Sequence, residues 1–218
     1  MRTFMGAILF SLLILGLSNK PSPVKPRKTR RSQGNTLNIA YLLDKNEFDN
    51  SKFPEVRHWL ERVHNKAQEE LKKTEHVNIQ LNITEINEAS EELSRRLKAW
   101  LNEGHVYGGW ILGFVKNESM KRTANPHIIC VLTRHTIYNE WESGMLAYSL
   151  HQNLCTSMVP MILTYKENEV DQSGKRLSEL IRNSTTSDFK EALNGCKMKK
   201  PNFGGGRRLR HSQKERLP

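Results

Sequence analysis

Two apolar stretches, LNIAYLL at residues 37–43 and HIICVLT at residues 127–133, decide the fold class of this chain. Each is a short and nearly continuous apolar run, which is typical of a buried β-strand. A similar run, VPMILTY, occupies residues 159–165. It carries Pro160 near its start, where the missing N–H disturbs a strand least. The sequence therefore predicts buried strands at all three places.

Amphipathic helices are predicted between these strands. Pro54 opens a helix over residues 54–73, Ser90 caps a second over residues 91–102, and a third covers residues 172–183. Apolar residues recur in them at spacings of three and four, which places them on one face of each helix. In chain order they are Val56, Trp59, Leu60, Val63, Ala67 and Leu71; Leu93, Leu97, Trp100 and Leu101; and Leu177, Leu180 and Ile181.

The alternation of strands and helices predicts an α/β fold with a mixed, mostly parallel sheet and two to three helices. Three further segments add detail to this prediction. VNIQLNI at residues 77–83 alternates apolar and polar residues, which predicts a strand with one wet face that presents Asn82. Residues 145–149 fit a short edge strand, whereas WILGFV at residues 110–115 fits either a strand or a short buried helix.

The charge of the chain is concentrated at its ends. The net charge is +11, from 34 Lys+Arg and 23 Asp+Glu in 218 residues. Residues 19–34 carry +6 and residues 197–218 carry +7, whereas residues 35–196 are slightly acidic at −3. A basic globular body of the histone or ribosomal kind is therefore excluded. We expect a disordered basic arm over residues 19–36, one domain over residues 37–196, and a disordered basic tail over residues 197–218.

The N-terminal residues have the pattern of a secretory signal peptide. Arg2 precedes an apolar run over residues 8–15, and Gly16 and Ser18 stand at the −3 and −1 positions of a cleavage after Ser18. The run is short for a membrane span, although an uncleaved signal anchor is the alternative. We therefore expect residues 1–18 to be a signal peptide, the protein to be secreted and extracellular, and no membrane span to follow.

Secretion changes the interpretation of two residue types. Asn82, Asn117 and Asn183 each begin an N-x-Ser/Thr sequon, so all three become candidate N-glycosylation sites, which must be exposed. The three cysteines, in an oxidising compartment, allow one disulfide and leave one thiol. This cysteine content is too low for a disulfide scaffold, so we expect a hydrophobic core to hold the fold.

The order of these elements resembles the metzincin zinc-protease domain, in the reprolysin-like form found in tick saliva. It is more closely similar to the short secreted 28 kDa metastriate salivary family of hard ticks. The resemblance covers roughly residues 37–196. It is carried by NIAYLL at 38–43, the helix around Trp59, VNIQLNI at 77–83, HIICVLT at 127–133, GMLAY at 144–148, Cys155, and VPMIL at 159–163.

The resemblance implies a truncated metzincin-like domain and a disulfide between Cys155 and Cys196. In reprolysin-like domains, a Cys after the edge strand bonds a Cys near the C-terminal end of the domain. Cys130 lies in an apolar strand and is expected to be a buried free thiol. Only 13 positions separate Asn183 from Cys196, so the subdomain that holds the third zinc ligand and the Met-turn is expected to be missing.

The zinc-binding motif of such proteases, H-E-x-x-H, places two His ligands on one helix face and a Glu between them as general base. The matching stretch here is Ser178-Glu179-Leu180-Ile181-Arg182. A Ser hydroxyl is a poor Zn²⁺ ligand, and the cationic Arg repels a metal. No His occurs between His151 and His211. The resemblance therefore implies a pseudo-metalloprotease, with Ser178, Glu179 and Arg182 as degenerate site positions and with no metal or cofactor.

The other histidines do not suggest a replacement site. His58 and His64 are six positions apart, which places them on different faces of a helix, and His127, His135 and His151 lack ligand-like spacing. No Gly-rich phosphate loop follows a strand, and no G-x-S-x-G nucleophile elbow is present. We interpret these histidines as ordinary core or surface residues.

Three functions remain as hypotheses. The first is a secreted, inactive metalloprotease-like protein that binds host extracellular molecules and modulates haemostasis, inflammation or immunity, as the resemblance implies. The second is a binder of glycosaminoglycans such as heparan sulfate, or of other anionic surfaces, through basic tail residues. The third is an active zinc metalloprotease with an unusual site. Location outside the cell excludes nucleic acid as the partner. The polyanion-binding candidates are Lys197, Lys199, Lys200, Arg207, Arg208 and Arg210.

Overall fold

The computed structural model describes residues 35–150, 153–186 and 188–198. The chain separates into two compact units, residues 1–32 and 33–218, and all described residues belong to the second. The predicted signal peptide, almost all of the basic arm and residues 199–218 of the basic tail lie outside the described residues. Within the described ranges, no helix is long and apolar enough to cross a membrane.

A five-stranded sheet forms the centre of the described unit, in the order β2-β1-β5-β8-β7. The first four strands are parallel, and β7 pairs antiparallel with β8 at one edge. This arrangement confirms the predicted mixed, mostly parallel sheet. The strands are β1 (Asn35–Leu43), β2 (Ile79–Glu88), β5 (Ile128–Thr133), β7 (Ala147–Ser149) and β8 (Val159–Thr164).

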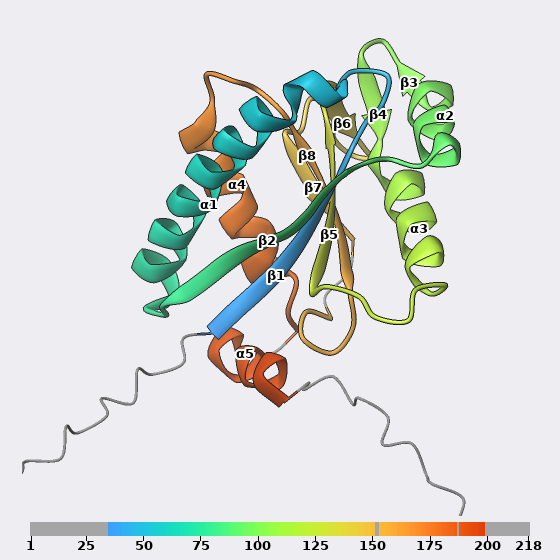
Figure 1. The fold of residues 1–218 in the computed structure, drawn as a ribbon. Coiled ribbons are helices and arrows are strands. Elements are labelled where there is room, and N and C mark those ends of the chain that lie inside the picture. The colour runs from blue at the N-terminus through green and yellow to red at the C-terminus, as the bar shows by residue number, and fades with distance from the viewer. Residues whose placement is uncertain (1–34, 151–152, 187, 199–218) are drawn as a thin grey trace, which may run out of the picture. The chain divides into compact units, whose positions relative to one another are not determined.

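Helices cover both faces of this sheet (Figure 1). Helices α1 (Phe53–Glu75) and α4 (Val170–Asn183) lie together on one face, and α2 (Glu91–Ala99) and α3 (Gly108–Ser119) on the other. A single 3₁₀ turn, η1 (Asn50–Lys52), precedes α1, and α5 (Phe189–Met198) follows α4. The described residues thus form five α-helices, more than the two to three that were expected.

Alternation along the central strands divides the core into two layers. In β5, Ile128, Cys130 and Leu132 face the core shared with α1 and α4, whereas Ile129 and Val131 face the core beside α2 and α3. Every residue of β5 and β8 is buried. Because both faces of these strands are covered, their sequences are continuous apolar runs rather than alternating ones.

The segment after α2 differs from the prediction of a helix to residue 102. The helix ends at Ala99, and Leu101–Asn102 form strand β3, which pairs with β4 (His105–Tyr107). Glu103 and Gly104 make the turn, with φ of 48° and 80°. Such positive φ values suit the two-residue hairpins that follow the twist of their strands. Leu101, expected to point inward, is 36% exposed.

A second, three-stranded sheet, in the order β3-β4-β6, was not predicted. Its third strand, β6, is Thr136–Tyr138. Beside it, residues 110–115 are helical within α3, which settles the ambiguity of their sequence pattern. A Cβ on Gly108 would lie 2.8 Å from Ile137 Cγ2 and 2.5 Å from Tyr148 Cδ1, so a glycine lets this helix begin directly against β6 and β7.

The domain boundaries shift slightly outward in the structure. Asn35 and Thr36, assigned to the arm, are the first residues of β1. Lys197, assigned to the tail, belongs to α5. The strand expected at residues 77–83 begins at Ile79 and continues to Glu88 along β1, with a register shift beside Ile39 and Ala40.

Candidate functional site

Helix α4 holds Ser178, Glu179 and Arg182, the three residues that the resemblance matches to the zinc-binding motif. Ser178 is buried, and its hydroxyl donates to the Lys175 carbonyl at 2.6 Å. Glu179 accepts a hydrogen bond from Arg176 at 2.8 Å. Arg182 lies 4.0 Å from the carboxylate of Glu75, the last residue of α1. A cavity of about 210 Å³ between the two helices is lined by Glu70, Thr74, Lys175, Ser178, Glu179 and Arg182.

Close packing brings this side of α4 against α1. A Cβ on Gly174 would lie 2.6 Å from Lys66 Cβ and 3.0 Å from the Val63 carbonyl oxygen. Gly174, Ser178 and Arg182 are four positions apart, so they lie on the same side of α4. The groups on this side of α4 are the Ser178 hydroxyl, which is hydrogen-bonded to a backbone carbonyl, and the Glu179 carboxylate, which is paired with Arg176. The cationic side chains of Lys175 and Arg182 lie beside them. Across the described ranges, no group of three or more His, Cys, Asp or Glu residues is arranged to hold a metal.

The one buried histidine of α1 forms a neutral pair with a tyrosine of β1. His64 is 3% exposed, and its Nε2 lies 2.7 Å from the hydroxyl of the fully buried Tyr41. Burial lowers the pKa of His64 to about 4 and raises that of Tyr41 well above its usual value. His58 is exposed, which confirms that the two histidines occupy different faces. His64 is therefore a hydrogen-bonded core residue.

The cysteine predictions are confirmed. Cys155 and Cys196 form a disulfide across a sequence separation of 41, with Cα atoms 4.6 Å apart. The bond ties α5 to the segment that leads into β8. Cys130 is a buried free thiol, and burial raises its pKa far above the ordinary range. A thiol so protonated is inert, so Cys130 is a packing residue.

The three sequon asparagines lie apart on the surface, each exposed. Asn82 is on β2, where its side chain donates to Asn38 Oδ1 at 3.0 Å. Asn117 is on α3, and Asn183 is the last residue of α4. Their glycosylation stays a prediction. Among the polyanion-binding candidates, Lys197 lies in α5, whereas Lys199, Lys200, Arg207, Arg208 and Arg210 lie outside the described residues.

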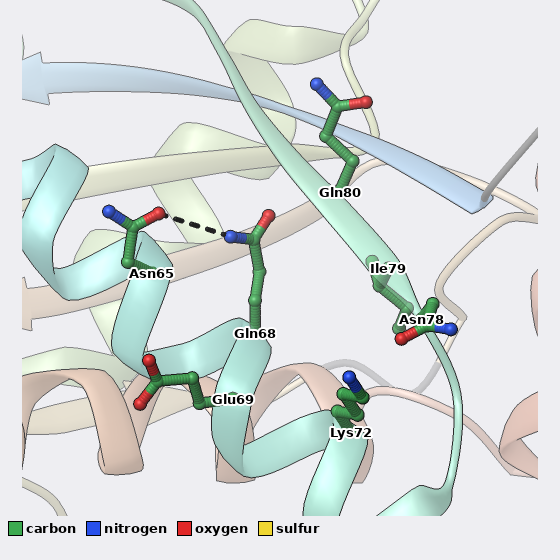
Figure 2. Close-up of a pocket in the computed structure, with 7 residues that line it drawn as sticks. All are labelled: Asn65, Gln68, Glu69, Lys72, Asn78, Ile79 and Gln80. Atoms are coloured by element: carbon green, nitrogen blue, oxygen red, sulfur yellow. Dashed lines mark hydrogen bonds between the residues drawn. The ribbon is translucent and has the colours of Figure 1, made fainter. Parts of the chain in front are cut away.

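A groove of about 480 Å³ runs between α1 and the edge strand β2 (Figure 2). Gln68 Oε1 accepts the Leu81 backbone N–H at 2.7 Å, and Gln68 Nε2 lies 3.5 Å from Asn65 Oδ1. An edge strand exposes unpaired N–H groups that invite pairing with another chain, and a side chain that occupies one of them blocks such pairing. The groove is lined by Asn65, Gln68, Glu69, Lys72, Asn78, Ile79 and Gln80. The Gln68 amide thus occupies one backbone N–H of β2.

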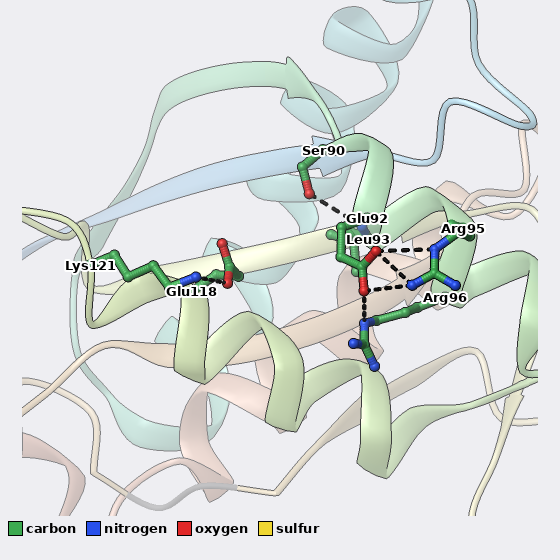
Figure 3. A network of polar contacts seen from close by, with 7 residues as sticks. All are labelled: Ser90, Glu92, Leu93, Arg95, Arg96, Glu118 and Lys121. Carbon is green, nitrogen blue, oxygen red and sulfur yellow. Dashed lines mark hydrogen bonds and ion pairs between the residues drawn. The ribbon is translucent and has the colours of Figure 1, made fainter.

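A polar network on the opposite side of the sheet belongs to the surfaces of α2 and α3 (Figure 3). Glu92 accepts from Arg95 and Arg96, each at 2.7 Å, and Glu118 pairs with Lys121. The two Glu92 pairs lie three and four positions apart on α2, and such pairs stabilise helices by roughly 0.2–0.5 kcal/mol each. Lys121 lies in the turn that follows the end of α3 at Ser119. The hydrogen bonds from the two arginines lower the pKa of Glu92. This network supports local structure and has no free group for chemistry.

Four aromatic side chains, Trp100, Tyr107, Trp110 and Tyr138, gather where the small sheet meets α3. Together with Trp141, whose neighbour Glu140 is hydrogen-bonded to Tyr107, we call them the aromatic surface. Edge-to-face contacts join Trp100 to Trp110 at 5.2 Å, Trp110 to Tyr107 at 5.1 Å and Tyr107 to Tyr138 at 5.2 Å between ring centroids. Trp110 is 59% exposed and Trp141 is 92% exposed. A tryptophan so exposed buries its ring only on meeting a partner.

The loop that displays Trp141 is held by hydrogen bonds at both ends. Ile137 and Met145 exchange two backbone bonds, at 2.8 and 2.9 Å, which close the loop over residues 138–144. Within it, Asn139 Oδ1 accepts the N–H of Trp141 at 2.8 Å and that of Glu142 at 2.7 Å. Gly144 has a φ of 76°, as the return of the loop requires. Trp141 thus stands at the tip of a defined turn.

Tyr107 connects this loop to the small sheet. Its hydroxyl donates to the Glu140 carboxylate, which raises the pKa of Tyr107 to about 12 and lowers that of Glu140. The aromatic surface was not predicted, because its members come from separate segments of the chain, each too short for a periodic pattern. The cluster of Trp and Tyr within residues 100–110 was the one available signal.

No protein-family model and no curated protein matches this chain. Among solved structures, metalloproteinase-II from Bacteroides fragilis is similar over 67% of this chain, with 12% identity and a TM-score of 0.44. The chain spans only 42% of the length of that protein. Archaemetzincin from Methanopyrus kandleri is similar over 74% of this chain and 87% of its own, with 11% identity and a TM-score of 0.43.

Proposed function

We propose that this protein is a secreted, catalytically inactive metalloprotease-like protein that binds host extracellular molecules and so modulates haemostasis, inflammation or immunity. The single observation that carries the loss of activity is the donor set on α4. Ser178 and Arg182 stand where the H-E-x-x-H motif has its two zinc-binding histidines. The Ser178 hydroxyl donates a hydrogen bond to the Lys175 carbonyl, and Arg182 lies near the Glu75 carboxylate. Neither side chain is a Zn²⁺ donor under these conditions.

Glu179, at the position of the general base, supports the same proposal. Its carboxylate is paired with Arg176, and a base needs a metal-bound water beside it to do hydrolytic work. Binding is instead supported by the aromatic surface, because exposed Trp and Tyr are the residues that most often anchor protein interfaces.

Metal analysis of the purified full-length protein tests the inactive state. We expect zinc far below one equivalent and the same thermal unfolding temperature with and without EDTA, because no metal contributes to folding. One equivalent of zinc, removed by the chelator with a fall in the unfolding temperature, would overturn the proposal. A pull-down from host plasma then identifies the bound molecule, with Trp141→Ala as the matched variant.

A second candidate function rests on charge at the chain ends. Residues 19–34 carry +6 and residues 197–218 carry +7, against −3 for residues 35–196. Contacts of this kind with heparan sulfate or an anionic surface are mainly Coulombic and weaken with salt. Heparin retention before and after deletion of residues 199–218, which leaves α5 intact, tests this function. Unchanged retention after the deletion would exclude a role of that segment.

A further inference from the structure

We propose that the aromatic surface binds an extended, Arg- or Lys-bearing segment of a partner protein, with Trp141 as the anchor and Glu140 and Glu142 as the charged contacts. This inference rests on the proposed binding function and names the chemistry of the partner. It follows from three properties of the surface: exposed rings, unneutralised carboxylates and a fixed loop.

The rings offer faces to a cation. Trp141 and Trp110 are the two most exposed aromatic side chains among the described residues, and Tyr107 contacts Trp110 while its hydroxyl reaches Glu140 beside Trp141. Guanidinium and ammonium groups are attracted to the faces of Trp and Tyr. The surface already shows this preference internally, because Arg96 lies 5.3 Å from the Trp100 ring and 4.7 Å from the Phe114 ring.

The charge beside Trp141 is negative, and no base of the described residues is paired with it. The Glu142 carboxylate has no hydrogen-bond or ion-pair partner among the described residues. The Glu140 carboxylate accepts from the Tyr107 hydroxyl and from its own backbone N–H, and neither of these donors is a cation. Residues 100–110 and 136–144 contain neither Lys nor Arg. Arg96, which lies over the Trp100 ring, is paired with Glu92 at 2.7 Å.

This combination selects among partners. Anionic lipids and heparan sulfate would meet two negatively charged carboxylates beside the anchor, and the repulsion disfavours both partners. A purely apolar partner would make no favourable electrostatic contact with those carboxylates. A segment that carries Arg or Lys satisfies the rings and the carboxylates together. Because the loop is already closed by the Ile137–Met145 bonds, little ordering is required when the partner binds.

The indole N–H signals of the full-length protein provide the test. The chain has four tryptophans, so selective ¹⁵N labelling gives four indole resonances, assigned with Trp110→Phe and Trp141→Phe. Trp59 is an internal control, since it is buried and its indole donates to the Lys166 carbonyl at 2.9 Å. The probe is an Arg-Gly repeat peptide, and a Glu-Gly repeat of the same length is the charge-reversed control.

We expect the Arg-Gly peptide to shift the Trp141 and Trp110 signals along one binding curve and to leave Trp59 unmoved. Two rim ion pairs predict about 5- to 10-fold weaker binding for Glu140→Gln/Glu142→Gln. The matched control, Glu61→Gln/Glu69→Gln, removes the same charge from the exposed side of α1 and should bind like the wild type.

Several outcomes would overturn this proposal. Equal shifts with the Glu-Gly peptide would show that the surface does not select a cationic partner. An unchanged affinity in the Glu140→Gln/Glu142→Gln variant would show that these carboxylates do not contact it. Broadening of the Trp141 signal by phosphatidylserine vesicles, without a response to the Arg-Gly peptide, would make the surface a membrane contact instead. These results are independent of zinc content, so failure here and failure of the inactive-protease proposal are separate observations.

Discussion

Lowering the pH from 7 to 5 is expected to cost this fold about 2 kcal/mol through His64 alone. His64 is buried between α1 and the sheet, and Tyr41 Oη lies 2.7 Å from its Nε2. Burial keeps Tyr41 protonated, so its hydroxyl can donate to Nε2 when the neutral imidazole carries its proton on Nδ1. A proton on Nε2 would remove this acceptor and place an uncompensated charge in the core.

The magnitude follows from the two states of the imidazole. The pKa of His64 is about 4 in the folded protein and about 6.5 in the unfolded chain. Acid therefore protonates the unfolded chain first and favours unfolding. This stability is fully present above pH 6.5 and is lost as the pH falls through 4. The full difference corresponds to about 3 kcal/mol, of which about 2 kcal/mol is lost by pH 5.

Urea unfolding at pH 7, 6 and 5 measures the effect, with circular dichroism as the signal. His64→Gln is the diagnostic variant, because its amide oxygen can accept from Tyr41 but does not titrate in this range. The variant should be less stable at pH 7 through imperfect packing, yet lose about 2 kcal/mol less than the wild type between pH 7 and 5. His58→Gln, on the exposed side of the same helix, should follow the wild type. Parallel pH profiles for the wild type and His64→Gln would refute the reasoning.

Two other features of the described unit give testable predictions. Gly174→Ala should lower the free energy of unfolding by about 1 kcal/mol, because overpacking against Val63 and Lys66 outweighs the gain in helix propensity. Gly113→Ala, where an added Cβ meets nothing within 4 Å, should instead raise it by up to about 1 kcal/mol in the same urea titration; a loss of stability at Gly113 would contradict the packing account. Replacing Cys155 and Cys196 by Ser should lower the free energy of unfolding by roughly 2–4 kcal/mol, because the disulfide is lost. Thermal unfolding of the wild type and of the double variant, with and without a reductant, checks this. A reductant-sensitive unfolding temperature in the double variant would show that this disulfide does not cause the effect of the reductant.

The parts of the fold that were predicted correctly are those whose sequence pattern is local. The helix from Pro54 places its apolar stripe on the core as its spacing indicated, and the runs over residues 127–133 and 159–165 form adjacent buried strands. Where one sequence pattern fits both a strand and a helix, contacts with residues distant along the chain decide which of the two forms. Residues 110–115 are helical because Gly108 allows α3 to pack directly on Ile137 and Tyr148. Leu101 leaves the predicted helix because pairing with Val106 satisfies its backbone in a hairpin.

The candidate sites divide in the same way. The absence of histidines at positions 178 and 182 is visible in the sequence, since it concerns residue identity alone. The tertiary structure alone decides that Ser178 is hydrogen-bonded to the Lys175 carbonyl and that its side of α4 packs on α1. The aromatic surface could not be predicted, because parallel pairing of β4 with β6 is what brings Tyr107 opposite Tyr138.

By itself, the sequence determined the fold class, the concentration of positive charge at the ends of the chain, and the absence of histidine from the predicted helix over residues 172–183. All three depend on residue type and short-range periodicity. Only the tertiary structure decided that His64 is neutral, that Cys130 is inert, and that Trp141 stands exposed beside Glu140 and Glu142. The physical reason is that burial, desolvation and charge pairing are set by side chains distant along the chain, and no local pattern records those neighbours.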